Sequence, residues 1–214
     1  MTEKIHEIVA ELADELELKN VARDKALPDT RRLVRQAALA IRALHRGDVA
    51  EATELLRTGR VMVEQIRKDL AAFPDLYWSG YVLDAQKEYA EASIVAALIS
   101  DSPVPSPADL NVEISSYLNG LGEAASEMRR YVLDIIRHGG AERHHDGERA
   151  LALMDDIYTA LITVDFPDAL TGGLRRTTDL VRGVLERTRG DLTMSLRQAQ
   201  LEKALSSQGQ PNPG

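Results

Sequence analysis

Two groups of carboxylates stand out because their spacing places several acids on one side of a helix. Asp84, Glu88 and Glu91 recur at intervals of four and three residues in the stretch DAQKEYAEASIVAAL. At about 100° per residue, these three side chains fall within an arc of roughly 60°. A like-charge pair four residues apart destabilises a helix by a few tenths of a kcal/mol. The arrangement therefore points to a purpose other than helix stability.

A second pair, Glu123 and Glu127, lies one turn apart in SSYLNGLGEAASEMRRYVLD. By a helical-wheel estimate, the pair lies roughly opposite the apolar stripe of its helix, which runs from Ile114 to Ile136. Taken alone, two glutamates in this position are typical of a solvated face.

Carboxylates that converge from two helices are the ligands that Mg²⁺ and Mn²⁺ prefer, because hard cations bind oxygen. The acids near residue 88 share their face with Tyr77, Tyr81 and Val95, which indicates a partly enclosed site. Clustering of like charges there raises carboxyl pKa values unless a cation neutralises them. A metal ion held in this way activates water and stabilises the charge that develops on a phosphodiester. The spacing leaves open whether the two helices meet.

A basic stripe occurs in RRLVRQAALAIRALHR, where Arg31, Arg35, Arg42 and Arg46 fall within roughly 60° of one another. Few acids share this helix. The stripe could bind RNA phosphates, because the arginine fork suits them. Alternatively, the same arginines bridge acids on neighbouring helices or subunits.

The composition favours helices. Of 214 residues, 44% are hydrophobic and only 4% aromatic, with 14 glycines and 8 prolines. Such a mixture predicts an all-α fold and gives little material for strands. The chain contains no cysteine, which excludes disulfides, zinc–thiolate sites and thiol nucleophiles. We also find no GxSxG, GxGxxG or HExxH motif.

The net charge of −8 argues against a uniformly basic nucleic-acid binder, although it leaves room for a local basic groove. Apolar runs such as ASIVAALI are shorter than the roughly 18–20 residues that cross a bilayer. The acidic, amphipathic first residues do not have the features of a signal peptide. We therefore expect a cytoplasmic protein that does not enter a membrane.

Helical periodicity and helix-breaking residues predict one domain, 1–205, built as a bundle of about seven helices, followed by a disordered tail, 206–214. The expected elements are a helix marked by Ile5, Ile8, Val9, Leu12 and Leu16; a second up to Gly47, with Pro28 either opening it or kinking a longer helix; a third from an Asp48 cap to about Ala72; a fourth capped by Asp75 and containing 84–98; and, after a loop at 101–110, helices at about 108–137, 148–163 and 174–205. The segment RHHDGER is expected to be a polar loop or a frayed helix start.

Three segments resemble the translin family, and within it translin-associated factor X (TRAX) more than translin itself. The segment 21–48 is similar to the family's Arg-Asp, Lys/Arg-Arg and Leu-His-Arg signature. The segment 86–95 resembles the Glu-Tyr-x-Glu-Ala motif of TRAX, and 115–130 resembles its Tyr-Leu-x-Gly-x-x-Asp-x-x-x-Glu segment. The resemblance extends over most of 1–205. It implies a translin-like helical bundle that assembles into a hollow octamer.

The resemblance also implies an activity, because TRAX-like proteins are Mg²⁺-dependent endoribonucleases acting on single-stranded RNA. By motif position, Glu88, Glu91, Glu123 and Glu127 are the catalytic residues, and the first three hold Mg²⁺ or Mn²⁺. Glu123 stands where TRAX has an aspartate, which lengthens the arm by one methylene. Asp84 is a further metal ligand on the helical wheel alone.

Two alternatives remain open beside the nuclease. The first is a non-catalytic, translin-like protein that binds single-stranded RNA or DNA. The second is a purely structural helical oligomer. The basic RNA-binding motif of translin, expected at 76–81, is absent from this chain, because DLYWSGY contains no basic residue.

Overall fold

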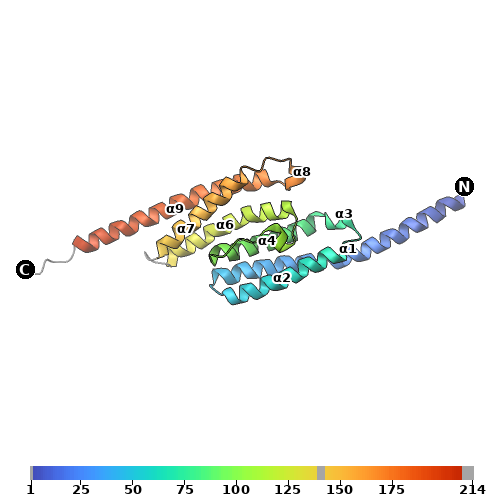
Figure 1. Cartoon of the computed structure of the whole chain (residues 1–214), viewed down its shortest axis with the longest axis horizontal. Helices are drawn as coiled ribbons and strands as arrows, with labels where there is room; N and C mark the ends of the chain where they lie inside the picture. The colour runs from blue at the N-terminus through green and yellow to red at the C-terminus, as the bar shows by residue number, and fades with distance from the viewer. Residues whose placement is uncertain (1, 139–142, 209–214) are drawn as a thin grey trace, which may run out of the picture.

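The computed structural model describes residues 2–138 and 143–208. Within these residues the chain is mostly helical and contains no strand (Figure 1). The long helices of these residues are α1 (Thr2–His45), α2 (Val49–Asp69), α4 (Gly80–Ile99), α6 (Ile114–His138), α7 (His144–Leu161) and α9 (Leu174–Gln208), and the single turns are α3 (Pro74–Tyr77), α5 (Pro107–Leu110) and α8 (Asp168–Thr171). The all-α prediction is confirmed.

The first two predicted helices are one continuous helix, α1, with Pro28 inside it. A proline removes one backbone hydrogen bond, and here the remainder of the 44-residue helix continues across it. Asp48 caps α2 as predicted, because its carboxylate accepts a hydrogen bond from the Glu51 backbone nitrogen at 2.9 Å.

Other predicted boundaries are wrong. Asp75 lies inside the single turn α3, and α4 begins only at Gly80, after Ser79. The predicted helix at 108–137 is divided into α5 and α6, because Asn111 adopts a left-handed backbone conformation that ends the first turn. The sixth helix begins at His144, not at Glu148, so RHHDGER contains a helix start, one of the two alternatives expected for it. The predicted tail starts too early, because α9 extends to Gln208; residues 209–214 lie outside the described residues.

The central helix of the bundle is α4, which packs against α1 on one side and α6 on the other. All three run in the same direction (Figure 1). The start of α4 packs beside Leu33 of α1, and its end packs beside Leu44. Because neighbours cover α4 on two sides, most of its side chains are buried, and only a narrow polar face remains open.

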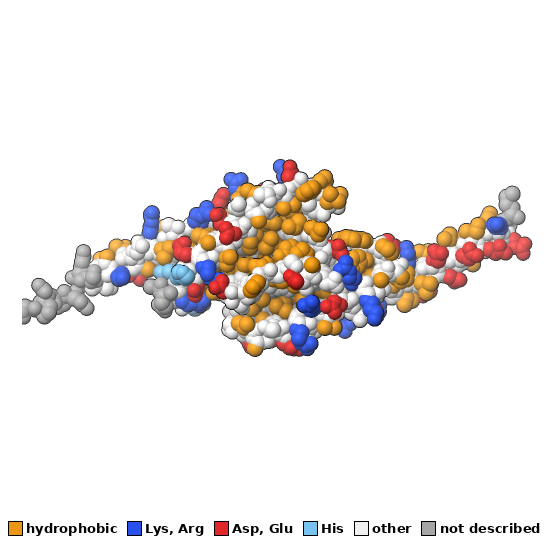
Figure 2. Space-filling view, viewed as in Figure 1, with side chains coloured by type: hydrophobic (Ala, Val, Ile, Leu, Met, Phe, Trp, Pro, Cys, Tyr) orange, Lys and Arg blue, Asp and Glu red, His pale blue; other side chains and the backbone are white. Residues whose placement is uncertain are grey.

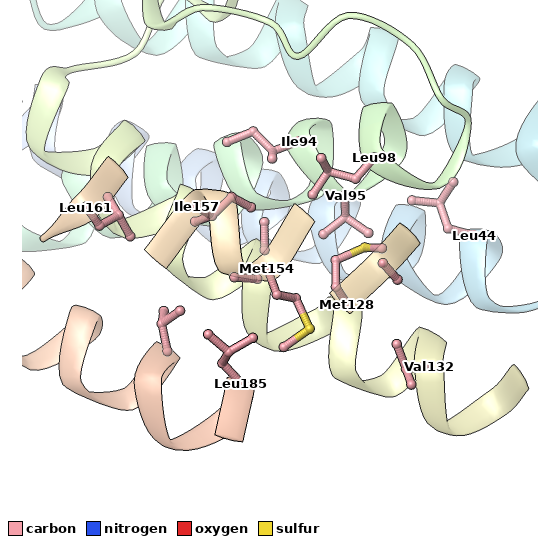
Figure 3. Close-up of a cluster of buried hydrophobic side chains, with 14 of the residues drawn as sticks. Leu44, Ile94, Val95, Leu98, Met128, Val132, Met154, Ile157, Leu161 and Leu185 are labelled. Atoms are coloured by element: carbon pink, nitrogen blue, oxygen red, sulfur yellow. The ribbon is translucent and has the colours of Figure 1, made fainter. Parts of the chain in front are cut away.

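The hydrophobic core joins α4 and α6 to α7 and α9, as Figure 3 shows. Its largest fully buried side chains include Ile94, Met128, Met154 and Leu161. Many alanines fill the helix contacts, which allows the helix axes to lie close together. The core therefore fixes the spacing of α4 and α6 tightly.

The N-terminal half of α1 projects from the bundle (Figure 1). The side chains that predicted this helix are exposed, and Figure 2 shows apolar and acidic side chains along it; the apolar ones include Ile5, Ile8, Val9, Leu12 and Leu16. The spacing of these side chains correctly predicts a helix, but no element of the described chain packs on them. None of the described helices is both long enough and apolar enough to cross a lipid bilayer.

Candidate metal centre

α4 and α6 approach each other closely at Gly120. A Cβ atom at this position would lie 2.8 Å from the carbonyl oxygen of Lys87 and 3.0 Å from the backbone nitrogen of Glu91. Only glycine permits this distance, because backbone atoms cannot move aside as a flexible side chain can. The two backbones are thus brought together directly beside the predicted acids.

The register between the two helices decides which acids meet. The hydroxyl of Ser116 donates a hydrogen bond to the carbonyl oxygen of Leu83 at 2.8 Å, so the helices pair residues that are 33 positions apart. In this parallel register, Glu88 and Glu91 of α4 lie level with the part of α6 that carries Glu123. Carboxylate oxygens of these three glutamates lie within 4.8 Å of one another.

Asp84 is not part of this cluster. It lies about one turn before Glu88 on α4, where the register places it opposite Tyr117 rather than an acid. Its side chain is exposed. The helical wheel correctly predicts the face of α4 on which Asp84 lies. The register between α4 and α6, however, places Asp84 about two turns away from Glu123 along the bundle.

Glu91 is the buried member of the cluster, with only 7% of its surface exposed. Burial is the main cause that raises the pKa of the Glu91 carboxyl to about 8; the charges of Glu123, Glu88 and Glu127 add to this rise, and Lys87 opposes it. The protein therefore encloses a carboxyl group that lacks sufficient positive charge around it.

Lys87 is the cation nearest to the cluster in the described residues. Its ammonium donates a hydrogen bond to Glu123 at 2.8 Å and lies 3.3 Å from Glu88. Desolvation lowers the Lys87 pKa, but the hydrogen bond and charge of Glu123, with the charge of Glu88, outweigh it, so the pKa is raised. One ammonium faces three carboxyl groups, and it contacts two of them.

Glu127 lies next to the cluster and has a different partner. The buried ring of His45, only 4% exposed, forms a hydrogen bond through Nε2 to Glu127 at 2.9 Å. This bond lowers the Glu127 pKa in spite of the carboxyl's burial. The other ring nitrogen, Nδ1, lies 3.6 Å from Asp134. His45 thus keeps Glu127 ionised and fixed in place, a role that the sequence did not indicate.

The four arginines of the predicted basic stripe are exposed, three on α1 and Arg46 directly after its end. Arg46 pairs with Glu51 of the neighbouring helix α2, as the bridging alternative expected. Arg31, Arg35 and Arg42 form no ion pair within the described part of the chain. They remain available to an outside partner.

The residues present fit a hard divalent cation. Three carboxylates supply oxygen ligands from two rigid helices, and three protein ligands leave positions of an octahedral shell for water and a phosphate oxygen. The raised Glu91 pKa is what a carboxyl shows when it is buried and its neighbours are mostly anionic. A cation at this position would reverse that shift by favouring the ionised form.

Glutamine at position 91 is expected to stabilise the metal-free protein at high pH. The folded-state pKa of about 8 lies above the ordinary value of 4.5. The contribution of this carboxyl to the free energy of unfolding is therefore fully present below about pH 4.5, where it is neutral in both the folded and the unfolded chain. The contribution is lost as the pH rises through about 8. At pH 9 in EDTA, Glu91→Gln should unfold on the order of 5 °C higher than the wild type. At pH 4.5 the difference should vanish.

Thermal unfolding followed by circular dichroism at the two pH values tests this expectation. The control is Glu148→Gln, which removes the same charge from an exposed glutamate that forms no ion pair among the described residues. A Glu91→Gln variant that is equally stable relative to wild type at both pH values would contradict the burial argument.

Proteins of known structure share this arrangement of helices, although no protein-family model matches the chain. The structure is similar to that of AfC3PO, solved alone and in complex with duplex RNA, with a TM-score of 0.82 and 31% identity over 90% of this chain and 98% of that one. It also resembles apo-NeC3PO in fold, with a TM-score of 0.78 and 19% identity over 87% of this chain and 96% of that one. An uncharacterised protein of Methanocaldococcus jannaschii is 30% identical over 190 residues, which cover 87% of this chain and 82% of that protein.

Proposed function

The chain belongs to the translin family of C3PO proteins, and from that membership we propose that it is a divalent-metal-dependent endoribonuclease of TRAX-like type acting on single-stranded RNA. The observation that carries the proposal is the meeting of Glu88, Glu91 and Glu123 within 4.8 Å. A buried Glu91 carboxylate beside the partly exposed carboxylates of Glu88 and Glu123, with one ammonium among them, destabilises a fold unless a metal ion binds there.

The chain's own residues divide the chemistry between them. Glu88, Glu91 and Glu123 would hold Mg²⁺ or Mn²⁺. The bound ion would supply the positive charge that stabilises the phosphodiester transition state and activates water. Glu127, which His45 keeps ionised, is the carboxylate that would accept a proton from the attacking water.

Nucleic acid and further copies of the chain are the proposed partners. The related AfC3PO was solved in complex with duplex RNA, which supports a nucleic-acid ligand here. The exposed apolar stripe on the projecting half of α1 supports assembly, because large exposed apolar patches mark interaction surfaces. A homo-oligomer, by family resemblance a hollow octamer, would place the glutamates inside its chamber.

A non-catalytic nucleic-acid-binding protein is the second candidate. Lys87 favours it, because its ammonium already neutralises part of the charge on Glu88 and Glu123. In that case the ion pairs replace the metal and stabilise the contact between α4 and α6.

Cleavage of end-labelled RNA separates the two candidates. We expect the purified protein to cut a single-stranded oligonucleotide in Mg²⁺ or Mn²⁺ but not in EDTA, and to cut the matching duplex more slowly. RNA binding without cleavage in either metal would favour the non-catalytic candidate. Cleavage that persists in EDTA would contradict a metal mechanism.

Lys87→Gln is expected to tighten metal binding. The substitution removes an ammonium that competes with the ion for Glu88 and Glu123, and it makes the cluster more negative by one charge. At an effective dielectric constant of about 20, a unit charge at this range changes binding by at least roughly tenfold. Isothermal titration calorimetry with Mn²⁺ measures the change, and Lys25→Gln on the surface is the control. Weaker Mn²⁺ binding by Lys87→Gln would contradict the competition.

A further inference from the structure

A basic pocket of about 480 Å³ opens where the C-terminal ends of α1 and α6 lie near one another. Its lining residues are Arg42 and His45 of α1, Arg46 directly after it, Arg130, Asp134 and His138 of α6, and Arg143. Four arginines and one aspartate give it an excess of positive charge, although the whole chain carries a net charge of −8.

The arginines of the pocket are not all neutralised by the protein. Arg46 pairs with Glu51, and Arg143 pairs with Asp146. Arg42 and Arg130 are exposed and form no ion pair within residues 2–138 and 143–208. Two unpaired guanidinium groups that line one cavity suit an anion with several oxygen atoms, because each group presents a planar fork of donors.

Asp134 is the acid that could repel such an anion. Its carboxylate lies 3.6 Å from Nδ1 of His45, and His45 is itself bonded to Glu127. Glu127 also lies near Arg130, but its carboxylate is bonded to His45. Among the residues that line the pocket, the two unpaired arginines outnumber the single aspartate, so positive charge is in excess there.

The pocket continues the face of α6 that carries the metal centre. Glu123, Glu127, Arg130 and Asp134 follow one another at intervals of four, three and four residues, which keeps them within roughly 60° around the helix. Arg130 lies seven residues beyond Glu123, or about 10 Å along the helix axis. His45 links the two regions, because it contacts Glu127 and also lines the pocket.

We propose that this pocket binds a backbone phosphate of the RNA strand about three nucleotides from the metal centre. The spacing follows from about 10 Å along α6 and a rise of about 3.4 Å per nucleotide in a stacked strand. The pocket thereby positions the strand across the carboxylates without reading its sequence. The identity of the ligand rests on the proposed function, whereas the site itself rests on the geometry of the unpaired arginines.

Metal-free binding tests the pocket separately from catalysis. Fluorescence anisotropy with a labelled single-stranded RNA in EDTA gives the Kd over a series of salt concentrations. Arg42→Gln/Arg130→Gln should bind roughly tenfold more weakly at 0.1 M salt, since neither side chain can then donate a charge-assisted hydrogen bond to the phosphate. The slope of log Kd against log salt should fall by about 0.7 for each phosphate that the variant no longer neutralises.

Arg176→Gln/Arg187→Gln is the matched control, because both of these arginines are exposed on α9 and have no ion pair in the described residues. If the Arg42/Arg130 variant binds with the wild-type Kd and slope, the pocket proposal is overturned, while metal-dependent cleavage would still support the proposed function. If the wild type shows no saturable RNA binding, both proposals fail. If only the Arg42/Arg130 variant loses affinity while the control does not, the pocket is the phosphate site.

Discussion

Replacing Glu88 and Glu91 together by glutamine is expected to reduce Mg²⁺-dependent RNA cleavage by about a thousandfold or more. The double substitution removes two of the three carboxylates that lie within 4.8 Å. Glutamine keeps the size of each side chain but not its charge, so the shape of the site is retained. A metal ion contributes several kcal/mol to transition-state stabilisation, and each 1.4 kcal/mol corresponds to about tenfold in rate.

The same variant should bind RNA in EDTA within about twofold of the wild type, because the carboxylates do not attract phosphates. Single-turnover cleavage and anisotropy measured on one preparation provide both readouts. Glu54→Gln/Glu64→Gln removes two charges from exposed glutamates of α2 and is the control. Wild-type cleavage rates in the Glu88/Glu91 variant would disprove the assignment of the metal centre.

Alanine at position 120 is expected to destabilise the fold and disable the site at once. The new Cβ would lie 2.8 Å and 3.0 Å from backbone atoms of Lys87 and Glu91. Overpacking of this kind costs about 1–3 kcal/mol, more than the roughly 1 kcal/mol that alanine gains over glycine in a helix. α6 must move away from α4, and a shift of about 1 Å at a catalytic site costs around a hundredfold in rate. Unfolding and cleavage assays measure the two effects.

Gly190→Ala is the matched control, because Gly190 also lies inside a helix but a Cβ there would meet no atom within 4 Å. This variant should be more stable than the wild type by up to about 1 kcal/mol. Opposite changes in stability on substitution of the two glycines by alanine would separate the effect of helix propensity from the effect of the contact between helices. A stabilised, fully active Gly120→Ala would show that the close approach does not set the geometry of the site.

Glu91 connects the chemistry of the site to the stability of the protein. Its raised pKa means that the metal-free fold prefers the neutral carboxyl. Metal binding needs the ionised form, so the ion must displace a proton as well as the Lys87 ammonium that contacts the neighbouring carboxylates. The close packing of α4 and α6 accounts for both competitors of the ion, because it buries the Glu91 carboxyl, which then holds its proton, and brings the Lys87 ammonium close to Glu123.

The sequence by itself determined the helical class and the angular position of the acids. Composition favoured helix, and the intervals between Asp84, Glu88 and Glu91 placed them on one face of α4. The Asp48 cap was also predictable, because capping depends on residues within one turn. These features are local, and a helix of known period fixes them without any neighbour.

Tertiary structure decided which of these acids meet. Periodicity gives an angle around a helix axis, but it gives neither the distance between two axes nor their register. The glycine at position 120 sets the distance, and the Ser116–Leu83 register selects Glu123 and leaves Asp84 outside. His45 joins Glu127 across 82 positions of sequence. Such contacts depend on the volumes of side chains packed between helices, and no local spacing encodes them.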